Sequence, residues 1–378
     1  AQRILALRMN PAAPLAAAGR SATAPSRGRA TKGRVLLVAL GGAALLSGLN
    51  AALVRLEVWA PIASDHLGDV HGQVMVLGFL GTLISLERAQ ALGRAWAFLA
   101  PALFGLGALA LNSPAPVLLG ELLQVEGGFI FVATYLALWR RAPRPLVAVQ
   151  VLSGVLALGG AVVVTFAGAP GGLPWLAGFV IVTIAAERAE LAALSMGRRA
   201  DLELLALASA LTLSVLAALV FPTIGERLVG VTVVATAAWL AVHDVARRQL
   251  RLTGQHRYLA TALLAGYANL LIAGVVLAVA GLRTSTATYD VVVHGVFLGF
   301  AVSMVMAHAP VILPAVLGRP LPYRPVLWVP LVVLHVSLGV RFLGALSGQN
   351  QLWQAGGVLG VLAMLTFLAT AITLVVRR

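Results

Sequence analysis

The sequence predicts an all-α polytopic membrane protein with twelve transmembrane helices. Of its 378 residues, 60% are hydrophobic and 11% are charged, and the mean hydropathy is +0.96. These values exclude an ordinary soluble domain. Apolar runs of about 20 residues, each long enough to cross about 30 Å of hydrocarbon as a helix, recur between short polar breaks. The predicted spans are residues 35–54, 67–86, 92–111, 115–138, 146–167, 173–193, 203–221, 224–245, 257–280, 289–314, 325–346 and 352–376.

The distribution of positive charge supports this count and indicates a topology. Lys and Arg accumulate in cytoplasmic segments of membrane proteins. With the N-terminus inside, 23 of the 27 Lys and Arg residues fall on the inner side, and the other 4 are Arg55, Arg227, Arg283 and Arg341. Both termini are therefore predicted to be cytoplasmic, in a cell inner or plasma membrane.

Residues 1–34, rich in Ala, Pro, Ser, Gly and Arg, are predicted to be a flexible basic cytoplasmic tail, and residues 35–378 a single twelve-helix transmembrane domain. The net charge of +14 is spread over every inner loop, so it indicates contact with anionic membrane lipid and not with nucleic acid. The absence of Cys excludes disulfides, thiolate metal sites, iron–sulfur clusters and covalent c-type haem.

Three spans share a sequence pattern. GFLGTLISLERA at residues 78–89 and GFVIVTIAAERA at residues 178–189 both have Glu-Arg-Ala beginning nine residues after the Gly. GFAVSMVMAHA, which begins at Gly299, has His308 at the position of that Glu. Because these segments lie in spans two, six and ten, the chain is predicted to contain three pseudo-repeated four-helix units.

Spans two and ten also begin alike, with DVHGQVMVLGF at residues 69–79 and DVVVHGVFLGF at residues 290–300. Both spans run from outside to inside in the predicted topology. His71 and His294 are therefore expected at similar depth near the outer surface.

Two neutral imidazoles that face one another have the chemistry of the axial ligands of a b-type haem. We therefore predict that His71 and His294 bind one haem b. The alternative is a pair of inert histidines at helix ends. Four neighbouring glycines are expected to leave room for the porphyrin face: Gly72, Gly78, Gly295 and Gly299.

Twelve helices, three four-helix units and histidines on spans two and ten together resemble subunit I of the haem-copper oxidases, whose low-spin haem is held by those two spans. The segment HGVFLGFAVSMVMAHAPVILPAVLGRPL, residues 294–321, is also similar to the haem- and copper-containing NnrS family. In that family an analogous His-led helix ends in a Gly-Arg-Pro-like turn, which Gly318, Arg319 and Pro320 match here. The resemblance implies haem-based redox chemistry, with nitric oxide as one candidate substrate.

The sequence departs from both families in its metal ligands. Spans six and seven contain no histidine, so the copper centre that oxidases use to reduce dioxygen is not expected. The NnrS-type pattern has a His just before the terminal Gly-Arg, where this chain has Ala315, Val316 and Leu317. The ligand set therefore does not support copper.

Two further histidines are candidates for a second site. His308 lies 14 residues after His294, which places both on nearly the same face of a helix, roughly 21 Å apart. His335 lies about halfway along span eleven. We predict that His308 and His335 form a lower site for a second haem or a metal, with hydrogen-bonded packing as the alternative.

Ionisable groups inside membrane spans are costly and often functional. Glu121 and Glu126 in span four are candidates for proton transfer, or for a pair that locks helix packing. Glu87-Arg88 and Glu187-Arg188, at inner helix ends, are expected to form structural ion pairs or to bind haem propionates. Arg341, near the outer end of span eleven, is a second candidate for binding propionates.

Three classes of function remain open on this basis. The first is a haem b redox protein that passes electrons, from membrane quinol, toward an outer-side redox protein or that handles nitric oxide. The second is a twelve-helix secondary transporter. The third is a non-catalytic assembly subunit in which the histidines serve packing alone.

Overall fold

The chain folds into a bundle of long helices. The computed structural model describes residues 27–64, 66–192, 196–197, 199–317 and 321–376, and this part contains no β-strand. Ten of its helices are long and apolar enough to cross a membrane. The predicted class, an all-α polytopic membrane protein, is confirmed.

The elements follow the predicted spans closely. They are α1 (Arg27–Arg55), α2 (Leu67–Gln73), η1 (Val74–Gly81), α3 (Thr82–Leu92), η2 (Ala95–Phe98), α4 (Leu99–Leu111), α5 (Val117–Arg141), α6 (Pro145–Leu191), α8 (Ala200–Val220), α9 (Pro222–His243), α10 (Ala246–Gln249), α11 (Gly254–Ala280), α12 (Thr286–His294), η3 (Gly295–Val302), α13 (Ser303–Leu317), η4 (Pro325–Leu327), α14 (Trp328–Ser347) and α15 (Asn350–Val376). Residues 27–34, predicted to be part of the tail, belong to α1, and residues 1–26 lie outside the described part.

The long element α6 is a helical hairpin. Gly168 has φ 72° and ψ 174°, a backbone conformation that favours glycine, and it interrupts the helix. Residues on either side of it then meet: a Cβ added to Gly172 would lie 2.3 Å from Val164, and one added to Gly160 would lie 2.6 Å from Leu176. The polar break predicted between two spans is thus a tight reversal. With the shorter helix Ala95–Leu111, the architecture is consistent with twelve crossings.

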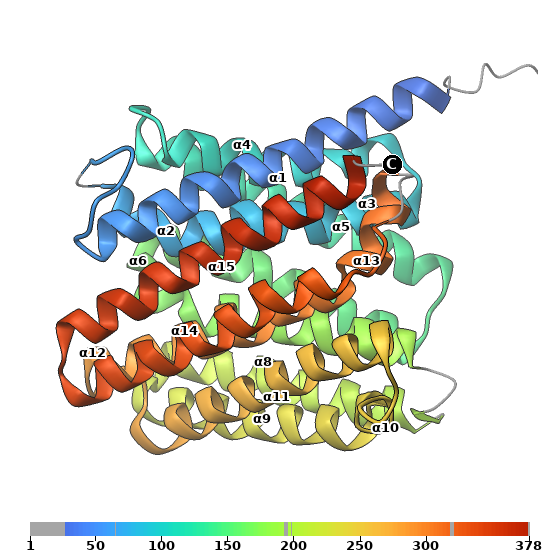
Figure 1. The fold of residues 1–378 in the computed structure, drawn as a ribbon. Helices are drawn as coiled ribbons and strands as arrows, with labels where there is room; N and C mark the ends of the chain where they lie inside the picture. Colours follow the sequence, from blue (N-terminus) through green and yellow to red (C-terminus); the bar gives the residue numbers. More distant parts are fainter. Residues whose placement is uncertain (1–26, 65, 193–195, 198, 318–320, 377–378) are drawn as a thin grey trace, which may run out of the picture.

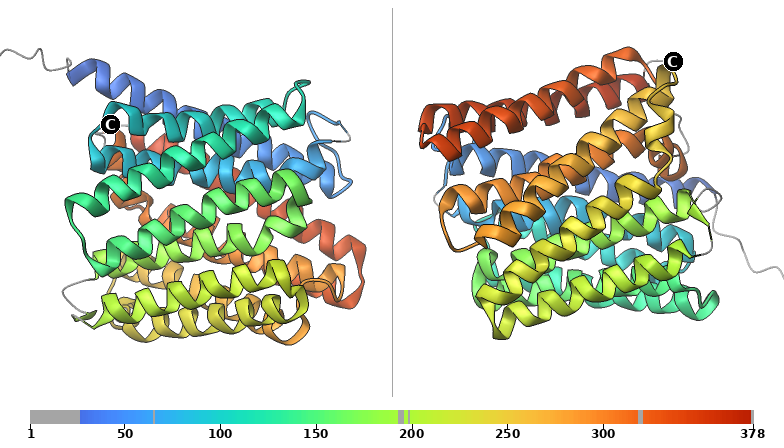
Figure 2. Two further views of the ribbon diagram at one scale, coloured as in Figure 1. Left: turned by 180° about the vertical axis from the view of Figure 1, so that it is seen from behind. Right: turned by 90° about the horizontal axis from the view of Figure 1, so that it is seen from below.

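Consecutive helices pack side by side, and the succession closes on itself. α4 contacts α5, α5 contacts α6, α6 contacts α8, and α8 and α11 flank α9. α14 packs along α15, which returns to α1 (Figures 1 and 2). The start of α1 and the end of α15 lie at the same end of the bundle (Figure 1).

Three segments occupy the centre of this ring, and they are the predicted spans two, six and ten. The most apolar window of Leu67–Leu92 is 61% buried and that of Thr286–Pro310 is 72% buried, whereas most outer helices have 33 to 44%. In the second half of α6, every residue from 172 to 186 is buried. Every fourth predicted span is therefore central, which is consistent with three four-helix units.

Two of the central helices share an unusual local feature. η1 and η3 are both π-helical segments of 8 residues. When the Leu-Gly-Phe triplets at Leu77 and Leu298 are aligned, η1 and η3 begin and end at equivalent positions. Because π-helical turns are rare and often occur at functional sites, this agreement marks spans two and ten as a matched pair.

The central helices have two chemically different ends. His71 lies in α2 and His294 is the last residue of α12, near the start of spans two and ten, and we call this the histidine end. The helices α2 and α12 lie at the same end of the bundle in Figure 1. Arg88 and Arg188 lie near the opposite end, which we call the arginine end.

Candidate functional site

His71 is anchored by α1. Its Nδ1 lies 2.8 Å from the backbone oxygen of Gly48. Because a carbonyl only accepts hydrogen bonds, Nδ1 carries the proton, and in the neutral ring Nε2 keeps a free lone pair. The carbonyl is within reach because α1 approaches closely at Gly48, where a Cβ would lie 2.5 Å from the sulfur of Met75.

His294 is anchored in the same way within its own helix. Its Nδ1 lies 2.9 Å from the backbone oxygen of Asp290 and 3.3 Å from one carboxylate oxygen of that residue. The Nδ1 proton therefore points to oxygen, and Nε2 again keeps its lone pair. In the described part of the chain, neither His71 nor His294 has a hydrogen bond to Nε2.

The two histidines share one region of the bundle. His294 is among the charged or titratable groups close enough to act electrostatically on His71, together with Arg55 and Arg341. Both rings are only half-buried. α6 packs closely against η1 and η3, but these two segments make no comparably close backbone approach to each other. The interface between spans two and ten is therefore the loosest of the three central interfaces.

The four glycines near these histidines differ in what surrounds them. A Cβ on Gly78 would lie 2.4 Å from Ala108, one on Gly295 would lie 2.9 Å from Ala273, and one on Gly299 would lie 2.5 Å from Asn269. These three glycines admit neighbouring helices, so the prediction that they leave room for a porphyrin was wrong for them. A Cβ on Gly72 would meet no atom within 4 Å, so Gly72 does border open space.

Arg341 reaches the histidine end from α14. Its Nε and Nη2 donate to the two carboxylate oxygens of Asp290 at 2.9 and 2.7 Å. Its guanidinium also lies 4.9 Å from the centre of the Trp353 ring. Two nitrogens of its guanidinium are therefore engaged with Asp290. The predicted contact of Arg341 with haem propionates stays a prediction.

At the arginine end, Arg188 is the centre of a buried network. Its Nε and Nη2 donate to the two carboxylate oxygens of Asp244 at 2.8 and 3.0 Å, and its Nη1 donates to Nε2 of His308 at 2.9 Å. The Tyr267 hydroxyl donates to Asp244 at 2.6 Å. The burial of Asp244 would raise the pKa of its carboxyl, but the hydrogen bonds and charge of Arg188 hold that pKa below its ordinary value of 3.8.

Arg88 forms a second network between spans two and six. Its guanidinium lies 2.6 Å from Glu87, 3.6 Å from Glu190 and 4.0 Å from Glu187. The predicted structural ion pair of Glu87 with Arg88 is therefore present, whereas Glu187 lies beside Arg88 and Arg188 pairs with Asp244. Arg88 of the first predicted unit reaches Glu187 of the second, and Arg188 of the second reaches His308 of the third. Ala309 stands where a third arginine would continue this pattern.

The predicted pairing of His308 with His335 is not formed. His308 accepts from Arg188 and also bonds to the backbone of Met304. His335 instead lies between Asn269, whose amide is 3.2 Å from its Nδ1, and Ser303, which is 3.2 Å from its Nε2. Both rings serve as links between helices, so the second haem site gains no support from this arrangement.

Glu121 and Glu126 lie on different faces of α5. Glu121 is half-buried and Glu126 is exposed on the outside of the bundle. No hydrogen bond or ion pair joins either carboxyl to another described residue. Their role in proton transfer stays a prediction. The buried polar side chain on this helix is Gln124, whose amide has no hydrogen-bond partner among the described residues.

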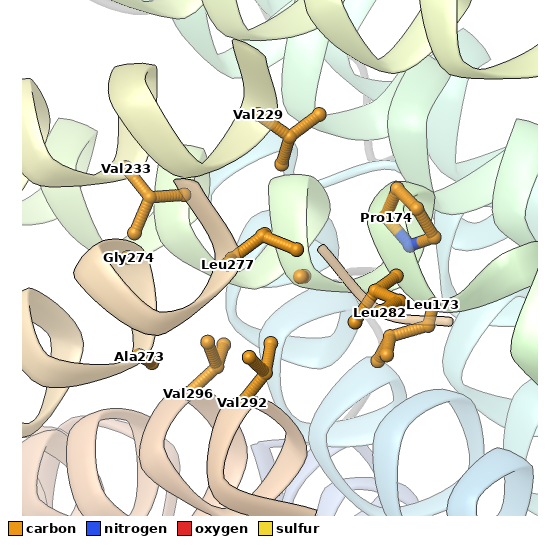
Figure 3. Close-up of a pocket in the computed structure, with 11 residues that line it drawn as sticks. Leu173, Pro174, Val229, Val233, Ala273, Gly274, Leu277, Leu282, Val292 and Val296 are labelled. Carbon is orange, nitrogen blue, oxygen red and sulfur yellow. The ribbon is translucent and has the colours of Figure 1, made fainter. Parts of the chain in front are cut away.

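A small hollow beside the central helices is apolar. It is lined by residues of α6, α9, α11 and the α12–η3 segment, and their side chains point into it from several directions (Figure 3). It has room for about one water molecule. Val292 and Val296 face it from positions two residues either side of His294, so His294 lies on roughly the opposite face of its helix.

No group of three or more His, Asp or Glu side chains is arranged to hold a metal ion in the described part of the chain. A site built from two histidines and a planar macrocycle makes no such demand, because the macrocycle supplies the other four ligands.

A family model described as a domain of unknown function, DUF8744, matches residues 34–376. The chain belongs to the DUF8744 family. The matched range takes in both ends of the central helices, so the DUF8744 domain is the helical bundle itself. No curated protein matches the sequence. The predicted relationship to the NnrS family and the haem-copper oxidases is not shown by this match.

Three residues of the DUF8744 domain that bind predicted site residues were not predicted from the sequence. Asp244 and Tyr267 complete the Arg188 network, and Asn269 holds His335. Asp244 stands alone among the basic residues that follow α9, a position from which it can neutralise an arginine at the same end. Tyr267 and Asn269 are polar residues inside an apolar span, which is the second available signal.

Proposed function

We propose that this protein is a haem b-binding membrane redox protein in which His71 and His294 supply the two axial ligands. The observation that carries the proposal is that each ring donates its Nδ1 proton to a backbone oxygen and leaves Nε2 free. A metal-binding histidine usually holds its second nitrogen in such a bond, which fixes the tautomer and the ring orientation. His308 and His335 have both ring nitrogens engaged and do not meet this condition.

The setting of the two rings supports the same proposal. Spans two and ten are central, yet their π-helical segments approach each other less closely than either approaches α6, and Gly72 beside His71 faces open space. A flat macrocycle between two imidazoles needs such a separation. The remaining central interfaces are joined by Arg88 and Arg188 and offer no comparable place.

A bound haem would supply a reversible one-electron couple. If His71 and His294 both bound the haem, no coordination position would remain for a substrate, so we propose electron transfer in preference to chemistry on nitric oxide. From the charge bias, we propose that the termini lie in the cytoplasm and that the histidine end lies at the outer face of the plasma membrane. Electrons would then pass from membrane quinol toward an outer-side redox protein, and the exposed Asp69 adds negative charge where such a partner docks.

The test is the absorption spectrum of the purified protein with and without its histidines. We expect a reduced-minus-oxidised b-type spectrum in the wild type, and its loss in His71→Ala and in His294→Ala. The matched control is His335→Ala. This substitution removes a ring within a membrane span whose two nitrogens are both hydrogen-bonded, and the variant should keep the spectrum. Full retention of the haem in both ligand variants would overturn the proposal.

The same preparation separates electron transfer from gas binding. Carbon monoxide added to the reduced protein should leave the spectrum unchanged, while a quinol analogue should reduce the haem rapidly. An immediate shift with carbon monoxide would indicate an open axial position and favour nitric oxide chemistry. Two haems per chain that fall to one in His308→Ala would restore the predicted second site.

A further inference from the structure

The two histidines of the proposed site differ in what lies behind them. Nδ1 of His71 faces the neutral carbonyl of Gly48, whereas Nδ1 of His294 lies between the carbonyl and the carboxylate of Asp290. Asp69, two residues before His71, is exposed, and no hydrogen bond or ion pair joins it to that ring among the described residues. The site is therefore electrostatically asymmetric.

The carboxylate of Asp290 is held in place from the other side. Arg341 binds both of its oxygens, and the arginine is itself fixed between α12 and α15. A Cβ on Gly356 would lie 2.4 Å from the backbone of Arg341, and one on Gly357 would lie 2.6 Å from its guanidinium. Both glycines therefore leave just enough space for the buried arginine, and Trp353 covers its face.

We propose that Arg341 and Asp290 form a positioning pair that sets the reduction potential of the cofactor held by His294, an inference that rests on the proposed function. A carboxylate behind the Nδ1 proton makes an imidazole a more basic ligand. A more basic ligand stabilises the oxidised metal, so Asp290 lowers the potential. Arg341 neutralises part of the negative charge of Asp290 and so limits this effect.

If this pair sets the reduction potential, substitutions of Asp290 and of Arg341 should shift that potential in opposite directions. Asp290→Asn removes the charge with little change in shape, and we expect a higher potential. Arg341→Gln keeps hydrogen-bond donors but removes the positive charge, and we expect a lower potential. Because Arg341 acts in part through Asp290, removing Arg341 should lower the potential less in the Asp290→Asn background than in the wild type.

The experiment is a redox titration of each purified variant with the haem-to-chain ratio measured beside it. Asp69→Asn is the matched control, since it makes the same chemical change near His71 without a contact, and it should not move the potential. If Arg341→Gln fails to fold, Arg341→Lys keeps the charge without the two-point contact, and its potential should lie below that of the wild type.

The outcomes separate this inference from the proposal beneath it. A wild-type protein without haem overturns the proposed function and the inference together. A wild-type protein with haem whose potential is unmoved in Asp290→Asn, or moves the same way in Arg341→Gln, overturns the inference alone. If Arg341→Gln lowers the potential equally in the wild-type and Asp290→Asn backgrounds, Arg341 does not act through Asp290 and the inference is overturned.

Discussion

The histidine end and the arginine end of the central helices are built from the same repeated segments, yet their polar groups are used differently. At the arginine end, both ring nitrogens of His308 are bonded and Arg188 engages three acceptors. At the histidine end, two rings are held by one nitrogen each and keep the other free. A saturated polar group joins helices, whereas a half-satisfied one that is held rigidly is able to bind a ligand.

The difference follows from the cost of polar groups in an apolar interior. A buried arginine or carboxylate is tolerated when its charge and hydrogen bonds are matched, as in the pair of Arg188 and Asp244. A neutral imidazole with a free lone pair costs less and can remain open to a metal. The charged groups at both ends are therefore paired, as Arg188 is with Asp244 and Arg341 with Asp290, whereas the two neutral imidazoles at the histidine end each keep a free lone pair.

The first prediction tests whether the Arg188 network stabilises the arginine end. Arg188→Met leaves Asp244 buried without its cation, and we expect a loss of about 3 to 5 kcal/mol of stability. The thermal unfolding midpoint in detergent measures this loss. Arg251→Met, which removes an exposed arginine at the same end, should have little effect. If the two substitutions lower the unfolding midpoint equally little, the Arg188 network does not stabilise the fold.

The second prediction sharpens the comparison through pH. Asp244→Asn should cost about 1.5 to 3 kcal/mol at neutral pH, because hydrogen bonds to a charged group are lost. The pKa of Asp244 lies below its ordinary value of 3.8 in the folded protein. Its carboxylate therefore stabilises the fold fully above that ordinary value, and the stabilisation disappears as the pH falls through the lowered pKa.

Unfolding midpoints of the wild type and Asp244→Asn, measured from neutral pH down into the acid range, provide the check. The gap between the two proteins should narrow as the wild-type carboxylate becomes protonated. A gap of constant size at every pH would show that the carboxylate does not carry this stability.

The smallest expected effect on stability comes from the histidine end. Gly72→Ala places its new methyl group in open space and should leave stability unchanged or improve it by up to about 1 kcal/mol. Gly78→Ala, the matched variant in the same span, places a methyl group 2.4 Å from Ala108 and should cost about 1 to 3 kcal/mol. The informative readout is the haem-to-chain ratio, which should fall in Gly72→Ala despite its intact fold. Full haem content in Gly72→Ala would mean that the porphyrin does not occupy this space.

Much of the fold could be predicted from the sequence because hydropathy and charge bias act at the scale of whole helices. The reversal at Gly168 lies in the break predicted between residues 167 and 173, but the tightness of the turn was not predicted, because the φ angle of one glycine does not follow from composition. The equivalence of spans two and ten was visible in their matched Leu-Gly-Phe triplets, but the π-helical turns that follow the histidines have no sequence signature.

The candidate site was only partly predictable for the same reason. The His-Gly pattern pointed to His71 and His294. The partner of His294 is Asp290 of its own helix, but the partner of His71 is Gly48 of α1, and Asn269, which binds His335, comes from α11. The pairing of Arg341 with Asp290 joins residues 51 positions apart. Contacts of this kind are decided by helix packing and not by spacing along the chain.

The most direct test of the central claim is the haem content and spin state of the purified wild-type protein, obtained from a pyridine haemochrome assay and low-temperature paramagnetic resonance on one sample. Two free imidazole nitrogens at one site predict about one b-type haem per chain in a low-spin, six-coordinate state. A protein that takes up no haem when haem is supplied during its expression, or that holds only high-spin haem, would contradict the assignment of His71 and His294 as paired ligands.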